Sequence, residues 1–114
     1  VWMKKPWGAC YWGGRPTEDW MFSTTHYSGA DWNDTHFKNE QFDKWLIEAR
    51  AETNQNKRRQ LYYEMQKMVS DEGGTVVPMF ANYVFAAHKN VQHGTMAGNW
   101  MMDGNKFHER WWFA

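Results

Sequence analysis

Apolar residues recur at helical spacing in two adjacent segments of the chain. The pattern predicts a helix from about Glu40 to Glu52 and a second from about Asn56 to Ser70, which Gly73 is placed to end. The short connection across Thr53 to Gln55 predicts a helical hairpin. Its apolar positions are Phe42, Trp45, Leu46 and Ala49 on the first helix and Leu61, Tyr62, Met65, Met68 and Val69 on the second.

A shorter helix is predicted before this hairpin. Thr17 is a residue type that caps helix N-termini, and Glu18 and Asp19 in the following turn are favourable against the helix dipole. We expect this helix to end near His26 to Gly29. The stretch from Ser28 to Asn39 is dense in Asp, Asn and Thr, which favour turns, and is therefore predicted as a loop.

Three segments carry the signals of strands. Ala9 to Trp12 is a short apolar run that stops at a pair of glycines. Thr75 to Phe80 is rich in β-branched residues and predicts a buried strand, and Asn82 to Ala87 is expected to be extended. The tail from His88 to Ala114 has no clean period and predicts turns with one short helix. The fold class expected from these elements is α/β, with the helical hairpin packed on strands.

Aromatic residues are abundant: the 114 residues include nine Trp, seven Phe and five Tyr, beside eight Met. Aromatic side chains supply large buried areas and, where they are exposed, flat surfaces for ligands. Most of the Trp side chains are expected to fill the core. Those in loops beside turn residues are candidates for ligand contact.

The charge balance bears on the expected partners. Thirteen Lys and Arg match thirteen Asp and Glu, so no net field attracts a phosphate backbone, and nucleic acid is not an expected partner. The longest uncharged apolar-leaning stretch, Thr75 to Ala87, is interrupted by Pro78 and Asn82 and is too short to span a bilayer. Direct membrane insertion of this chain is therefore not expected. The one cysteine, Cys10, cannot form an internal disulfide.

Residue types that carry catalysis or bind metals lack the spacing these roles need. The five His residues show no pair at helical i, i+4 spacing and no carboxylate partner at a fixed offset, so no metal or cofactor is expected. Ser28 and Ser70 lack the context of an activated nucleophile, and no carboxylate pair sits in a recognisable site. The chain is not expected to be an enzyme.

Six segments occur in an order that bears on the family. They are W-G-G-R-P from Trp12 to Pro16, D-W-N-D-T-H-F from Asp31 to Phe37, Phe42 to Arg50, K-R-R-Q-L-Y-Y-E-M-Q from Lys57 to Gln66, E-G-G-T-V-V-P-M-F from Glu72 to Phe80, and Glu109 to Phe113. Each segment is a weak signal alone, but the ordered series covers nearly the whole chain. In this order they resemble the C-terminal part of family 5 extracellular solute-binding proteins, the peptide-, opine- and nickel-type receptors of ABC transporters.

This resemblance implies a two-lobed periplasmic binding protein of the type II-like kind, with ligand enclosed between α/β lobes. Residues 1–114 would be the C-terminal part of one solute-binding domain, the end of the second lobe with the tail returning toward the first, without an independent second domain. Because the chain opens on Val1 and no signal peptide is visible, we expect it to be a fragment of a longer exported bacterial protein. Its partners would be a small-molecule or peptide-like ligand and the permease subunits that recognise the closed, periplasmic receptor.

The resemblance places a ligand site around Trp12. In the family a Trp at this position forms part of the cleft, and Gly13 and Gly14 would let an extended ligand approach the backbone closely. Trp32 and Asn33 could reach the same cleft, since Asn offers both a donor and an acceptor. The alternatives are that Trp12 is a core residue before an ordinary glycine turn and that Asn33 satisfies only its own loop.

Arg15 departs from the family pattern. Peptide-binding members typically carry an acidic residue about three positions after the Trp, where it pairs with the ammonium of the peptide. An Arg suits a carboxylate instead, so the ligand is expected to be a peptide-like, opine-like or other carboxylated compound. The structural alternative is that Arg15 pairs with Glu18 or Asp19. A second functional interpretation is a stand-alone, aromatic-rich carbohydrate-binding module.

Overall fold

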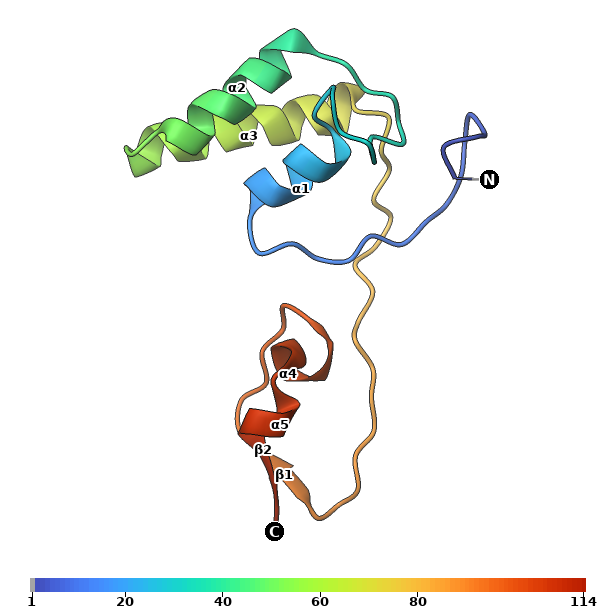
Figure 1. Cartoon of the computed structure of the whole chain (residues 1–114), viewed down its shortest axis with the longest axis vertical. Coiled ribbons are helices and arrows are strands. Elements are labelled where there is room, and N and C mark those ends of the chain that lie inside the picture. Colours follow the sequence, from blue (N-terminus) through green and yellow to red (C-terminus); the bar gives the residue numbers. More distant parts are fainter. Residues whose placement is uncertain (1) are drawn as a thin grey trace. The chain divides into compact units, whose positions relative to one another are not determined.

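The computed structural model describes residues 2–114, which contain five helices and two short strands (Figure 1). The chain divides into two units, Val1–Val77 and Pro78–Ala114. The first unit holds α1 (Glu18–Thr25), α2 (Glu40–Ala51) and α3 (Gln55–Glu72). The second holds β1 (Val91–His93), α4 (Met101–Asn105), α5 (Phe107–Arg110) and β2 (Trp111–Phe113).

Side-chain caps fix where the three long helices begin. Thr17 Oγ1 accepts a hydrogen bond from the Trp20 amide at 3.2 Å, as the sequence predicted. Asn39 caps α2 and Asn54 caps α3, each accepting from two backbone amides of the following turn. These bonds satisfy amides that have no partner inside the helix. Gly73 follows α3 as its C-cap, as predicted.

The core of the first unit lies where α1, α2 and α3 meet. Phe42 on α2 is fully buried, and its ring packs edge-to-face against Phe22 of α1 at 5.3 Å and Phe37 at 5.4 Å between centroids. The apolar stripes predicted on the hairpin are confirmed. The buried core residues are Phe22, Phe37, Phe42, Leu46, Ala49 and Met65, with Trp45, Leu61, Tyr62, Met68 and Val69 partly buried against them.

His26 is buried beside this aromatic core, with its ring centroid 6.0 Å from that of Phe22. Its Nδ1 lies 2.6 Å from Thr25 Oγ1, and its Nε2 lies 3.2 Å from Thr75 Oγ1. The Thr25 hydroxyl also donates to the Met21 carbonyl at 2.9 Å, which uses its single proton, so Nδ1 is the donor of the pair. In the neutral ring, which a lowered pKa favours, Nε2 accepts from the Thr75 hydroxyl. Burial lowers the pKa of His26 below its ordinary value of 6.5.

The second unit is organised around a buried carboxylate. Asp103 accepts from the Ala97 amide at 2.6 Å and from Trp111 Nε1 at 3.1 Å, and it pairs with Arg110 at 3.0 Å. The Ala97 hydrogen bond is the main cause of a lowered pKa for Asp103. These contacts hold α4, whose Met102, Asp103 and Gly104 have φ of 50°, 60° and 69°. Left-handed backbone is costly for Met102, so Asp103 anchors a turn that the local sequence does not favour.

Strands β1 and β2 pair antiparallel in this second unit, with Gln92 opposite Trp112. Both lie in the tail, where the sequence predicted turns and one short helix. Turns and the short helices α4 and α5 do form there, but the two strands were not predicted. The predicted strand at Ala9–Trp12 and the strand from Thr75 to Phe80 do not form, and Asn82 to Ala87 has no strand partner. A strand needs a neighbour to receive its hydrogen bonds, and the described residues supply none to these segments.

The fold class is therefore a mixture of helices and strands, as predicted at that level, and within the first unit the hairpin packs against α1. The hairpin of α2 and α3 packs side by side and is joined by α1 (Figure 1). The two-stranded sheet belongs to the other unit.

The neutral state of His26 makes the first unit sensitive to acid. Its folded pKa is lowered, so as pH falls below about 6.5 the unfolded chain takes up a proton that the folded unit resists, and stability drops. We expect His26→Phe to reduce this loss, measured by urea unfolding followed through α2 amide signals at neutral and mildly acidic pH. The exposed His36 provides the control, since His36→Asn should keep the pH dependence. An unchanged pH dependence in His26→Phe contradicts this account.

Candidate functional site

Three indole rings from separate segments of the first unit come together. The centroids of Trp12 and Trp32 lie 6.0 Å apart with their planes inclined by 50°. The ring of Trp2 also packs against Trp12, with centroids 6.4 Å apart and planes inclined by 64°. The structure thus brings together two of the residues that the sequence assigned to a ligand site.

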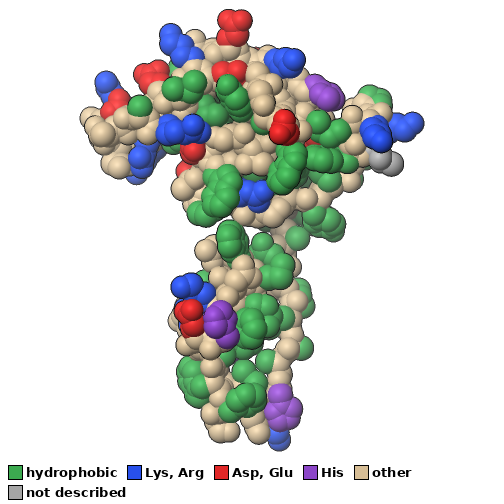
Figure 2. All heavy atoms as spheres, viewed as in Figure 1, with side chains coloured by type: hydrophobic (Ala, Val, Ile, Leu, Met, Phe, Trp, Pro, Cys, Tyr) green, Lys and Arg blue, Asp and Glu red, His purple; other side chains and the backbone are tan. Residues whose placement is uncertain are grey.

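An apolar depression of about 320 Å³ opens beside these rings. Its walls are the side chains of Trp2, Cys10, Tyr11, Trp12 and Trp32. The rings are open to solvent, since Tyr11 is 92% exposed and Trp32 is 49% exposed. On the face drawn in Figure 2 the first unit presents apolar side chains as well as charged ones. Trp12 is half-buried, so neither a core role nor a purely surface role describes it.

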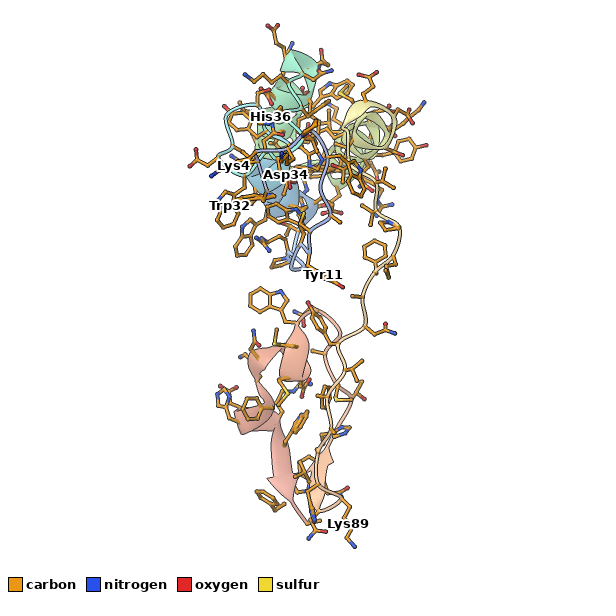
Figure 3. The ribbon with its side chains drawn as sticks, turned by 90° about the vertical axis from the view of Figure 1, so that its right-hand side faces the viewer. Lys4, Tyr11, Trp32, Asp34, His36 and Lys89 are labelled. Carbon is orange, nitrogen blue, oxygen red and sulfur yellow. The ribbon has the colours of Figure 1, made fainter. Side chains whose placement is uncertain are left out.

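Asp34 lies directly behind the walls of this depression. Trp2 Nε1 donates to Asp34 Oδ2 at 2.8 Å, and Cys10 Sγ lies 3.6 Å from the same oxygen. Loss of solvent and then the neighbouring Asp34 charge raise the pKa of Cys10, which keeps the thiol protonated as a donor. Figure 3 shows Trp32 and Asp34 close together in this unit.

Sequence reasoning missed Trp2, Cys10 and Asp34 as parts of this site. Trp2 and Asp34 are separated by 32 positions, and nothing in the local pattern around either residue indicates that they meet. Tyr11 was also missed, although its position next to Trp12 is a signal that could have included it.

Arg15 directs its guanidinium toward its own loop. Nη1 donates to the Gly13 carbonyl at 2.8 Å and to the Gly14 carbonyl at 3.4 Å. The guanidinium carbon also lies 5.8 Å from the centroid of the Trp20 ring, within range of a cation–π contact. Asp19 pairs instead with Arg50 at 3.1 Å. The contacts of Arg15 therefore order the glycine pair of the W-G-G-R-P segment.

Asn33 is buried and uses its whole amide inside the loop. Nδ2 donates to the carbonyls of Phe37 at 2.6 Å and Tyr27 at 3.3 Å. Oδ1 accepts from the Phe37 amide at 3.1 Å and from the Thr35 hydroxyl at 3.3 Å. These contacts agree with the structural alternative for Asn33, in which its side chain forms hydrogen bonds only within its own loop. Asn33 shapes the loop that carries Trp32.

A second depression, of about 520 Å³, lies between α1 and the hairpin. Its charged wall residues are Glu18, Asp19, Arg50, Arg58 and Arg59. Of these, Arg50 binds Asp19 through Nε and Nη2 at 3.2 Å each. Tyr62 also donates to Asp19 at 3.4 Å, and burial is the main cause of its raised pKa. These contacts connect α1 to α2 and α3.

Within residues 2–114, no three His, Cys, Asp or Glu side chains are grouped closely enough to hold a metal ion. None of the helices in that part of the chain combines the length and the apolar character that crossing a membrane requires.

Comparisons with protein-family models, with curated proteins and with solved structures give no match to this chain.

The role of Asn33 predicts a large effect of a small substitution. Asn33→Ala removes four hydrogen bonds and leaves the amide and carbonyl of Phe37 without this partner, so we expect a loss of roughly 2 kcal/mol or more in unfolding free energy. The measurement is urea unfolding, with the Trp32 indole signal reporting on the loop. Asp31→Ala, at an exposed position in the same loop, should change stability by no more than about 0.5 kcal/mol. Equal effects of the two substitutions would rule out this role.

Proposed function

We propose that this chain is part of the substrate-binding component of an ABC importer, which captures a small solute in the periplasm and delivers it to the membrane permease. The observation that carries the proposal is the ordered series of six segments that resembles family 5 solute-binding proteins. The pocket supports it, because two of these segments, W-G-G-R-P and D-W-N-D-T-H-F, supply Trp12 and Trp32 to one open aromatic depression.

The scaffold beneath the pocket also supports a binding role. The loop that carries Trp32 is tied to α2, because the Ser28 amide donates to Asp43 Oδ1 at 3.1 Å. Phe37, at the other end of the loop, packs in the core against Phe42. Trp32 is thus presented from a loop fixed at both ends, and a site of this kind loses little entropy when it binds a ligand.

The ligand class that Arg15 favours is a carboxylated compound, whether peptide-like, opine-like or of another kind. In the free protein the guanidinium is bonded to the Gly13 carbonyl, a neutral acceptor. A ligand carboxylate would add the attraction of an ion pair to this interaction, and two parallel N–H···O bonds could form. Release of the glycine loop would accompany binding.

The second candidate function is a carbohydrate-binding module, and exposed aromatic faces favour it. Trp2, Tyr11 and Trp32 are 47%, 92% and 49% exposed, and sugars stack on open rings. The neighbouring rings are inclined by 64° and 50°, however, so they form a hollow instead of one flat platform. A hollow suits a small solute better than an extended saccharide face.

The complete reading frame provides the first test. Under the proposal, the residues encoded before Val1 include a secretory signal peptide and a first α/β lobe, and native mass spectrometry of the complete protein detects a retained small molecule with an acidic group. Absence of that lobe, together with saccharide-dependent shifts of the Trp signals of the 114-residue chain, would favour the carbohydrate-binding module instead.

Arg15 provides the second test. In the complete protein, Arg15→Ala should weaken binding of the retained carboxylated solute by about tenfold or more, because a charge-assisted hydrogen bond is lost. Isothermal titration measures the affinity, and Arg59→Ala on α3 removes the same charge as a control. Unchanged affinity in Arg15→Ala would assign this side chain to the glycine loop alone.

A further inference from the structure

The aromatic depression has the chemistry of a site for an organic cation. Its described walls, from residues 2–114, are three indoles, a phenol and a thiol, with no Lys or Arg among them. Indole and phenol rings carry negative potential on their faces, so a cation placed over them is attracted. At about 320 Å³ the hollow lies at the small end of the range of ligand sites.

The Asp34 carboxylate, which contacts the wall residues Trp2 and Cys10, strengthens this preference for a cation. The two side-chain hydrogen bonds that Asp34 receives within residues 2–114 both end on Oδ2, from Trp2 and from Cys10. Oδ1 accepts none from the described side chains. The Asp34 charge therefore remains uncompensated by any cation in the described ion pairs, and it adds attraction for a positive group in the hollow.

The cations of neighbouring segments do not occupy the hollow. Arg15 directs its guanidinium to the carbonyls of Gly13 and Gly14 and to the Trp20 ring. Lys4 and Lys5 are exposed, and charges in solvent are screened over a short distance by salt. Among the described residues, the charged side chain that bonds to the walls is therefore that of Asp34, which is negative.

We infer that the hollow formed by Trp2, Tyr11, Trp12 and Trp32 binds a methylated ammonium group. The inference rests on the proposed function, because both place the ligand at Trp12, and it adds a cationic group to the proposed carboxylated solute. A methylated ammonium group spreads its charge over an apolar surface, so it can lie against the ring faces. It needs no hydrogen bond, and the aromatic walls offer few hydrogen-bonding groups.

Comparing the binding of choline with that of its neutral isostere 3,3-dimethylbutan-1-ol shows whether the charge or the shape of the ligand determines binding. The indole N–H signals of the chain, assigned with single Trp→Phe variants, report binding at each ring in nitrogen–proton correlation spectra at neutral pH. We expect choline to shift the Trp2, Trp12 and Trp32 signals saturably, and the alcohol to bind about tenfold more weakly. Equal binding of the two compounds, or no shift with choline, would overturn the inference.

Single substitutions test the roles of Asp34 and Trp12 in the proposed cation site. Asp34→Asn keeps the shape of the side chain and should weaken choline binding about fivefold, whereas Asp31→Asn removes the same charge from the same loop and should not. Trp12→Ala should abolish the shifts of Trp2 and Trp32, and Trp20→Phe should leave them intact. Circular dichroism verifies the fold of each variant, and the comparison of choline with its isostere in the unsubstituted chain decides the question if a variant unfolds.

Failure of this inference is distinguishable from failure of the proposed function. Acetate-dependent shifts that are lost in Arg15→Ala, without a response to choline, overturn the cation site and leave a carboxylate-binding receptor standing. A charge-dependent choline response in a chain whose reading frame lacks a signal peptide and first lobe supports the cation site and removes the transport receptor.

Discussion

The buried ring of Phe42 is the contact on which the first unit depends. Edge-to-face packing with Phe22 and Phe37 joins α1, α2 and the loop between them, and replacing such a ring by Ala typically costs about 3–5 kcal/mol. Phe37 is the end of the loop that carries Trp32. The position of a surface ring in the candidate site thus depends on a ring in the core.

Polar contacts carry this constraint from the core to the surface. Asn33 is bonded to both backbone groups of Phe37, so the loop cannot shift without breaking buried hydrogen bonds. Asp34, the next residue, accepts from Trp2 and thereby holds the N-terminal segment against the loop. The candidate site is consequently an assembly of three separate segments, which the Phe42 core and the Asp34 carboxylate hold together.

Features set by local sequence were predictable, and features set by distant contacts were not. The caps and the apolar spacing of α1, α2 and α3 are local, and these helices begin within about one residue of their predicted positions. Thr75–Phe80 has the composition of a strand, but pairing depends on a neighbour that composition cannot reveal. Trp12 and Trp32 were identified as site residues from a resemblance, whereas Trp2 and Asp34 depend on a contact across 32 positions. Arg15 could be placed beside the site, but its orientation toward Gly13 follows from the folded loop.

The candidate site depends on the contact between the Trp12 and Trp32 rings, and nuclear Overhauser effects between ring protons measure that contact directly. We predict cross-peaks from Trp12 to both Trp2 and Trp32, at the same time as cross-peaks between Phe37 and Phe42. Core cross-peaks without any between Trp12 and Trp32 would show a folded unit whose aromatic site is not assembled, and would contradict the account.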